Sequence, residues 1–153
     1  MRVVSVFIDT NVLLYSYDAR DEAKRDAARQ WIISLTDARA PVLNLQVLNE
    51  LTHVLLRRNW LGSPERVFET VNGLSEFGAT TIETRTVLAA RHIHLATRYS
   101  WWDCLLLASA IDLGCTYFLS EDLQDGQRIA APGARGLTII DPFAHSPDQI
   151  LVS

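Results

Sequence analysis

Short apolar segments alternate with longer amphipathic segments along this chain, and no other feature constrains its fold as strongly. The expected strands cover residues 3–8, 41–44, 80–82, 115–119 and 137–140. The expected helices are a short one from residue 11 and longer ones over residues 21–37, 46–60, 64–75, 84–97 and 100–112. Residues 124–135 are expected to be mostly loop. Because such an alternation is typical of a parallel sheet with both faces covered, we predict an α/β fold.

The length and composition predict a single domain that spans residues 1–153. A chain of 153 residues can bury most of its apolar surface around one core, and its 48% hydrophobic and 21% charged residues are typical of a folded protein. The apolar runs at residues 3–8 and 104–111 are too short for a signal peptide or a membrane span. Cys104 and Cys115 lack the spacing of a disulfide framework or a zinc site. We therefore expect a protein of the cytoplasm.

The net charge of −4 counts against binding of nucleic acid over a broad basic surface. This objection weakens if several acids form a metal site, because a bound cation reverses the local charge. Lys24 is the only lysine among the 14 basic residues, and arginine is the better ligand for phosphate. Arg20, Lys24 and Arg25 are candidates for contacts with an RNA backbone, although charged runs of this kind are often plain solvated surface.

Asp9 is the first acid whose position requires an explanation. It directly follows an apolar strand, and in parallel sheets the ligands bind outside the carboxyl ends of the strands. Asp9 and Asn11 are equally suited to cap the helix that follows. Asp9 alone therefore does not distinguish a structural role from a functional one.

Glu50 lies on the apolar stripe of its helix. Val47 precedes it by three residues and Val54 follows it by four, so helical geometry places the carboxylate on or beside that stripe. The alternative is a glutamate at the border of the stripe that reaches solvent or pairs with Arg57 or Arg58.

Asp103 also shares an apolar stripe, here with Leu106. A structural explanation is available, because Ser100 is suited to cap this helix and Asp103 is the third helical residue, as in a capping box. The two roles are compatible, since a helix N-terminus can hold an acid that also faces a cleft. Trp101 and Trp102 are expected to pack in the core or at its rim.

The segment at residues 120–126 supplies three further acids, Glu121, Asp122 and Asp125. Asp122 comes three residues after the expected strand at residues 115–119, so it lies just beyond the same edge of the sheet as Asp9. Each of the three is also an ordinary turn residue. The sequence leaves open which of them joins a site.

The acids on stripes and strand ends come from four separated parts of the chain, which suggests that the fold gathers them into one pocket. Two carboxylates about 4 Å apart repel by roughly 4 kcal/mol at an effective dielectric constant of 20, so a cluster needs protons or a cation. Oxygen ligands without His or Cys favour Mg²⁺ or Mn²⁺ over zinc. Such an ion lowers the pKa of a bound water molecule, and the resulting hydroxide can attack a phosphodiester.

Four segments resemble those of a known family. They are residues 7–15 (FIDTNVLLY), 49–50 (NE), 99–108 (YSWWDCLLLA) and 119–127 (LSEDLQDGQ). Together, and in the expected order along nearly the whole chain, they resemble the PIN-domain ribonucleases and, more narrowly, the VapC-type toxins of bacterial toxin–antitoxin pairs.

This resemblance implies a five-stranded parallel sheet in the order 3-2-1-4-5, with helices on both faces. It also implies a Mg²⁺-dependent endoribonuclease that hydrolyses single-stranded or looped RNA, with Mn²⁺ as a possible substitute. The acids of the resembling segments would be both catalytic residues and metal ligands: Asp9, Glu50, Asp103 and Asp122.

The same resemblance implies supporting residues and partners. Thr10 or Asn11 corresponds to the polar residue beside the first acid, and Ser120 to the hydroxyl residue two places before the fourth. The expected partners are the RNA substrate, a cognate antitoxin whose basic side chain enters the acidic pocket, and a second copy of the chain in a homodimer; no membrane is expected.

Two other functions are compatible with parts of the sequence. A HAD-like phosphatase also places an aspartate at the end of its first strand, but that family resembles Asp-x-Asp and Asn11 replaces the second acid here. A catalytically silent module that binds RNA or sequesters an antitoxin is the alternative from another functional class.

Overall fold

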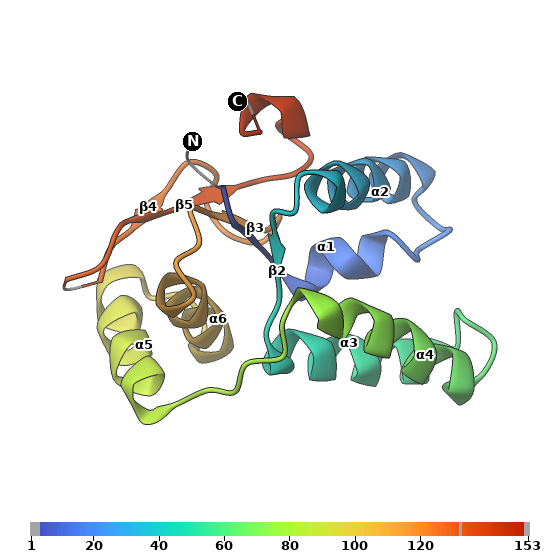
Figure 1. The fold of residues 1–153 in the computed structure, drawn as a ribbon, viewed down its shortest axis with the longest axis horizontal. Coiled ribbons are helices and arrows are strands. Elements are labelled where there is room, and N and C mark those ends of the chain that lie inside the picture. Colours follow the sequence, from blue (N-terminus) through green and yellow to red (C-terminus); the bar gives the residue numbers. More distant parts are fainter. Residues whose placement is uncertain (1–3, 132, 152–153) are drawn as a thin grey trace.

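The computed structural model describes residues 4–131 and 133–151, in which helices pack against one five-stranded sheet (Figure 1). The strands are β1 (Val6–Ile8), β2 (Pro41–Val42), β3 (Tyr117–Leu119), β4 (Arg128–Ile129) and β5 (Leu137–Ile140). The α-helices are α1 (Thr10–Tyr15), α2 (Glu22–Asp37), α3 (Leu45–Arg58), α4 (Pro64–Leu74), α5 (Thr84–Thr97) and α6 (Trp101–Asp112). Two short 3₁₀ helices complete them, η1 (Ser75–Phe77) and η2 (Pro147–Gln149). Helix α2 lies on one side of the sheet, and α5 and α6 lie on the other.

The strand order is β2-β1-β3-β5-β4, and the pairs from β2 to β5 are parallel. This confirms the predicted α/β class and the predicted order of the four central segments. Val3, which was expected to begin the first strand, lies outside the described residues.

Both edges of the sheet differ from the prediction. Residues 80–82 were expected to form an edge strand, but they contribute only one bridge, between Thr80 and Asn44. The ladder is cut short because α3 begins at Leu45, immediately after that bridge. At the other edge, β4 lies in the expected loop and pairs antiparallel with β5. Gly126, at φ 80°, reverses the chain there, and Ile129 gains burial by joining the sheet.

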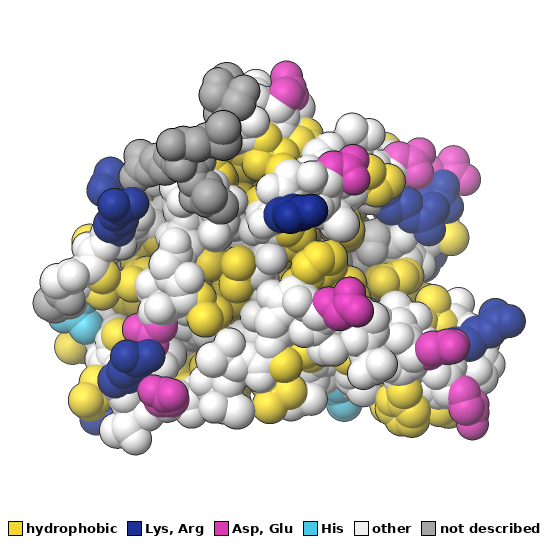
Figure 2. Space-filling model, viewed as in Figure 1, with side chains coloured by type: hydrophobic (Ala, Val, Ile, Leu, Met, Phe, Trp, Pro, Cys, Tyr) yellow, Lys and Arg dark blue, Asp and Glu magenta, His cyan; other side chains and the backbone are white. Residues whose placement is uncertain are grey.

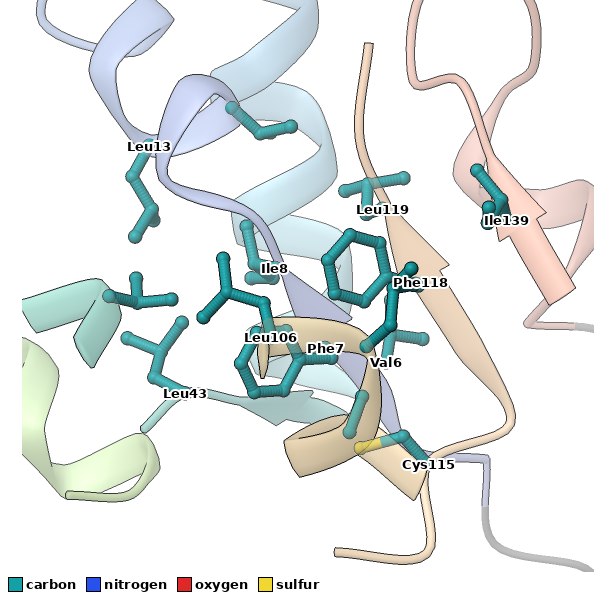
Figure 3. Packing of buried hydrophobic residues seen from close by; sticks show 14 of the residues in the cluster. Val6, Phe7, Ile8, Leu13, Leu43, Leu106, Cys115, Phe118, Leu119 and Ile139 are labelled. Carbon is teal, nitrogen blue, oxygen red and sulfur yellow. The ribbon is translucent and has the colours of Figure 1, made fainter. Parts of the chain in front are cut away.

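The centre of the core lies where β1 and β3 meet α6. The rings of Phe7 and Phe118 stack in neighbouring strands with their centroids 5.4 Å apart. Figure 3 shows these rings together with Leu106 of α6. Burial of one such side chain contributes roughly 1.5–3 kcal/mol to folding. The rigid β1–β3 pair therefore fixes the positions of Asp9 and Ser120, the residues that directly follow its two strands.

Asn44 connects the two helices that carry Glu50 and Asp103. Its side-chain oxygen accepts a hydrogen bond from the backbone N–H of Val47 (3.0 Å) and caps α3. Its amide group donates to Oγ of Ser109 in α6 (2.9 Å). Because Asn44 is fully buried, this pair of bonds holds α3 in a defined position against α6.

The described surface carries both signs of charge. On the face drawn in Figure 2, Lys and Arg side chains are interspersed with Asp and Glu side chains. None of the helices within residues 4–131 and 133–151 has the length and apolarity that crossing a bilayer requires. Cys104 and Cys115 are buried free thiols.

Candidate active site

Asp9 combines the two roles that the sequence left open. It is the N-cap of α1, since its Oδ1 accepts a hydrogen bond from the backbone N–H of Thr10 (2.7 Å). Its Oδ2 accepts a hydrogen bond from the Ser120 hydroxyl (2.8 Å). The side chain lies at the carboxyl end of β1 and only 6% of its surface is exposed. Burial raises the pKa of Asp9 to about 7, the Ser120 bond opposes this change, and repulsion by Asp103 and Glu50 adds to it.

Glu50, on α3, adds slightly by repulsion to the rise in pKa that burial causes in Asp9, and it is held by two donors. The hydroxyl of Thr10 donates to its Oε2 (2.7 Å), and the amide of Gln46 donates to its Oε1 (3.0 Å). Within the described chain, Arg57 and Arg58 form no ion pair with it. Glu50 is therefore an oriented, half-buried carboxylate rather than half of a surface salt bridge.

Asp103 joins the same group from the first turn of α6. Its backbone N–H donates to the Ser100 hydroxyl (3.2 Å), so the predicted cap is also confirmed. Burial raises the pKa of Asp103, and repulsion by Asp122 and Glu50 raises it further. The four acids therefore influence one another electrostatically, although they come from distant parts of the chain.

Asn11 selects Asp122 among the three acids of the β3–β4 connection. Its side-chain amide donates to Oδ2 of Asp122 (2.8 Å) and also lies within hydrogen-bonding distance of Ser120 Oγ (3.3 Å) and Asp9 Oδ2 (3.5 Å). Asp122 is thus tied to the residues that follow β1 and β3.

The two competing acids are engaged elsewhere. Glu121 forms an ion pair with Lys24, which removes that lysine from the candidates for RNA contact. Asp125 accepts hydrogen bonds from the His145 ring (2.7 Å) and from the backbone N–H of Asp141 (2.9 Å). Asp122 is therefore the one of the three whose side chain contacts the predicted site residues.

The donor chemistry of this site fits a hydrated Mg²⁺ ion. No three Asp, Glu, His or Cys side chains of the described residues are arranged to hold a metal ion directly. Mg²⁺ commonly uses only one or two carboxylates and retains several water molecules. The side-chain oxygens of Asn11 and Gln46 are buried without a hydrogen-bond partner in the described structure. Because buried acceptors are rarely left unpaired, these oxygens suit the water shell of a cation.

Gln46 is a site residue that the sequence analysis missed. It precedes Glu50 by four residues and therefore lies on the same helix face, which is the signal that could have identified it. Trp101 is half-buried against the core, as expected, but Trp102 is 64% exposed. Both tryptophans line an apolar groove of about 1030 Å³ that reaches Glu50.

The model of the PIN domain family matches residues 6–130 of this sequence. This chain belongs to the PIN domain family. The matched segment extends from β1 to β4 and includes all four acids. No curated protein sequence matches the chain significantly.

Solved structures share the fold of this PIN domain at low sequence identity. The VapBC2 complex of Rickettsia felis contains a chain with 11% identity and a TM-score of 0.60, covering 90% of this chain and 100% of that one. A toxin–antitoxin complex from Klebsiella pneumoniae contains a chain with 18% identity and a TM-score of 0.60. The match covers 90% of this chain and 98% of that one. VapC20 of Mycobacterium tuberculosis, a toxin that cleaves the sarcin–ricin loop, has 22% sequence identity and a TM-score of 0.55. The match covers 74% of this chain and 87% of VapC20.

Proposed function

We propose that this PIN domain is a Mg²⁺-dependent endoribonuclease and the toxin of a VapBC-type toxin–antitoxin pair. The observation that supports this most strongly is the group of four acids that includes the buried Asp9: Asp103 and Glu50 repel Asp9, and Asp122 and Glu50 repel Asp103. Such a group is unfavourable in the absence of protons or a cation. The similar folds of VapBC complexes and of VapC20, an RNA-cleaving toxin, support the same proposal.

In this proposal Asp9, Glu50, Asp103 and Asp122 bind the ion directly or through water. A bound Mg²⁺ would supply positive charge beside the phosphate and would make a nearby water molecule more acidic. The hydrogen bonds described above keep three of the acids in place, because Asp9, Glu50 and Asp122 each accept from a fixed donor. The expected substrate is single-stranded or looped RNA, whose backbone can approach the carboxyl edge of the sheet.

Thr10, Asn11 and Ser120 act as positioning residues rather than as reacting groups. Each donates from its side chain to one or more of the acids: Thr10 to Glu50, Ser120 to Asp9, and Asn11 to Asp122. Partners of this kind typically change metal affinity or activity 10- to 100-fold when removed. They fix which carboxylate oxygens remain free for the ion.

We further propose an antitoxin partner, a homodimer and a cytoplasmic location. The groove beside Glu50 offers exposed apolar surface that includes Trp102 and Leu45. A partner segment with apolar side chains could cover this surface and extend a basic side chain to the acids. Light scattering of the purified protein, alone and with the product of a neighbouring gene, tests the dimer and the partner.

The decisive test incubates the purified protein with structured RNAs and Mg²⁺ or Mn²⁺. We expect cleavage that stops with chelator and in Asp103→Ala, and that continues in Asp37→Ala, a matched control at an exposed helix end. Cleavage that survives both the chelator and Asp103→Ala would end the proposal. RNA that stays intact but is bound equally well by wild type and Asp9→Asn would instead support the catalytically silent module.

The phosphatase alternative loses its basis with the family assignment. In the Asp-x-Asp pattern of those phosphatases, the second aspartate would fall at position 11. That position holds Asn11, whose side chain donates a hydrogen bond to Asp122. Accordingly, we expect no turnover of phosphomonoesters and no phosphorylated Asp9.

A further inference from the structure

A second, smaller pocket opens directly beside the acids. Its volume is about 270 Å³, and Asn11 and Asp122 form part of its wall. The pocket is also lined by Arg20, Arg58 and Trp60. Two more acids, Asp18 and Glu121, line it as well, and they are paired with Arg20 and Lys24. A ligand in this pocket would therefore contact two guanidinium groups while its neighbouring part lies at the proposed active site.

Trp60 places the two guanidinium groups. The Arg20 guanidinium carbon lies 5.2 Å from the centroid of the Trp60 ring, and that of Arg58 lies 5.9 Å away. Cation–π contacts of this length hold both side chains against one half-buried ring. The pair is thus positioned before any ligand arrives, which lowers the entropy cost of binding.

The two arginines differ in how much positive charge they can offer. Arg20 donates to both carboxylate oxygens of Asp18 at 2.9 Å, so much of its charge is already balanced. Arg58 forms no ion pair with any carboxylate of the described residues. The hydrogen bonds from Arg20 lower the pKa of Asp18, and the charge of Arg58 contributes to this change. The charge of Arg58 is nevertheless less fully balanced than that of Arg20 and is the more available of the two for an anion.

The other cations that the sequence suggested for RNA contact are less available. Lys24 is paired with Glu121, and Arg25 with Asp26. The large apolar groove that Glu50 lines has no Lys or Arg among its described lining residues. In the pocket lined by Arg20 and Arg58, Asp18 and Glu121 are each paired with a cation, so Arg58 is the lining cation without an ion-pair partner among the described residues and is suited to a phosphate group.

We propose that this pocket binds the RNA backbone phosphate next to the scissile one. Arg58 and Arg20 contact the phosphate oxygens, and Trp60 is a positioning residue. This inference rests on the proposed ribonuclease function and adds to it a defined path for the substrate. Because a phosphate contact carries no base information, the pocket should act on all RNA sequences alike.

The test compares Arg58→Gln with Arg57→Gln, an exposed arginine of the same helix that does not line the pocket. Steady-state cleavage is measured with Mg²⁺ on a fluorescent single-stranded RNA of mixed sequence. Arg58→Gln should raise KM several-fold and leave kcat nearly unchanged, because the contact is made equally in the ground and transition states. Arg57→Gln should match the wild type.

The salt dependence of RNA binding gives an independent readout, measured in the Asp103→Ala background to prevent cleavage. Arg58→Gln removes one phosphate contact, so the slope of log affinity against log salt concentration should become less steep by about 0.7. As the salt concentration rises from about 50 to about 200 mM, the RNA affinity of Asp103→Ala divided by that of the double variant with Arg58→Gln should therefore fall roughly 2.6-fold. Trp60→Leu should show the same trend, and Trp60→Phe, which keeps a ring, should restore most of the binding.

The outcomes separate this inference from the proposed function. If the wild type cleaves no RNA with either metal, the ribonuclease proposal fails, and the pocket proposal fails with it. If the wild type cleaves but Arg58→Gln and Arg57→Gln share the same KM and salt slope, only the phosphate pocket is refuted. Unchanged RNA binding by Arg58→Gln with loss of a protein partner would assign the pocket to an acidic protein segment and also refute it.

Discussion

Thr10 donates a hydrogen bond from its hydroxyl to Oε2 of Glu50, 2.7 Å away, and so joins the first residue of α1 to the middle of α3. The backbone N–H of the same threonine donates to Asp9. One residue therefore orients two acids that are 41 positions apart in the sequence. The predictions below begin with this residue.

Thr10→Val should weaken Mg²⁺ binding. Valine has nearly the same shape but lacks the hydroxyl, so Glu50 loses a donor while the buried packing is retained. We expect a roughly 10-fold higher Mg²⁺ requirement for RNA cleavage, measured by titrating the ion. Thr10→Ser keeps the hydroxyl and should remain close to the wild type. An unchanged requirement in Thr10→Val would show that this bond does not orient a metal ligand.

Asp9→Asn should stabilise the metal-free protein at high pH. The Asp9 carboxyl keeps its proton up to about pH 7 when folded, whereas its ordinary pKa is 3.8. Between these values the folded state binds more protons, so the free energy of unfolding falls as pH rises from about 4 to about 7. An asparagine at position 9 does not titrate, so this fall in the free energy of unfolding should be absent in Asp9→Asn.

At pH 8 we expect Asp9→Asn to raise the free energy of unfolding by on the order of 2 kcal/mol. The gain is smaller than the pKa change alone would give, because the amide cannot accept both of the hydrogen bonds that Asp9 accepts. Thermal unfolding with chelator should show it as an increase in Tm of roughly 4–8 °C. The gain should disappear near pH 4. A Tm difference that does not depend on pH would contradict the raised pKa.

Mg²⁺ should stabilise the wild type against heat at pH 8. An ion that binds only the folded state, at a concentration about 100 times its Kd, adds about 2.7 kcal/mol to the free energy of unfolding. Asp9→Asn should lose most of this gain, because one proposed ligand is neutral. The measurement is Tm against Mg²⁺ concentration, with the exposed-site variant Asp37→Ala as the control. An equal gain in all three proteins would place the ion elsewhere.

Asp122→Asn should reduce RNA cleavage much more than Glu121→Gln. Asp122 contacts Asn11 and repels Asp103, whereas Glu121 is held by Lys24. We expect a loss of at least 10-fold in kcat/KM for Asp122→Asn and less than about threefold for Glu121→Gln. The reverse order would identify Glu121 as the fourth acid.

Asn44→Ala should destabilise the fold. The substitution removes the cap of α3 and leaves the Ser109 hydroxyl without its buried partner. We expect a loss of about 2–3 kcal/mol in urea unfolding. Ser63→Ala is the matched control, since it removes an exposed cap of α4 and should cost about 1 kcal/mol or less. Equal losses would mean that the link to α6 contributes little.

The local features of this protein could be predicted from its sequence. Apolar runs and helical periodicity identified the four central strand segments, all six α-helices of the described chain and its α/β class. They also identified Asp9, Glu50 and Asp103 as unusual, because an acid at a strand end or on an apolar stripe departs from a pattern that neighbouring residues define. These signals depend on residues within about one helical turn.

Other features were decided only by the tertiary structure. The choice of Asp122 as the fourth acid depends on its hydrogen bond with Asn11, 111 positions away. It also depends on the fact that the other two candidates are engaged elsewhere, Glu121 with Lys24 and Asp125 with His145. At one edge of the sheet, the expected strand at residues 80–82 is reduced to a single bridge between Thr80 and Asn44. At the opposite edge, the unexpected strand β4 forms by pairing with β5.

The sequence by itself therefore determined which elements form and which acids are exceptional, because propensity, periodicity and capping act between near neighbours. Only the folded chain decided which acid completes the group, how far burial and repulsion raise the pKa of Asp9, and where two arginines meet Trp60. The physical reason is that hydrogen bonding and Coulomb repulsion depend on distance in space. Separation along the chain does not specify that distance.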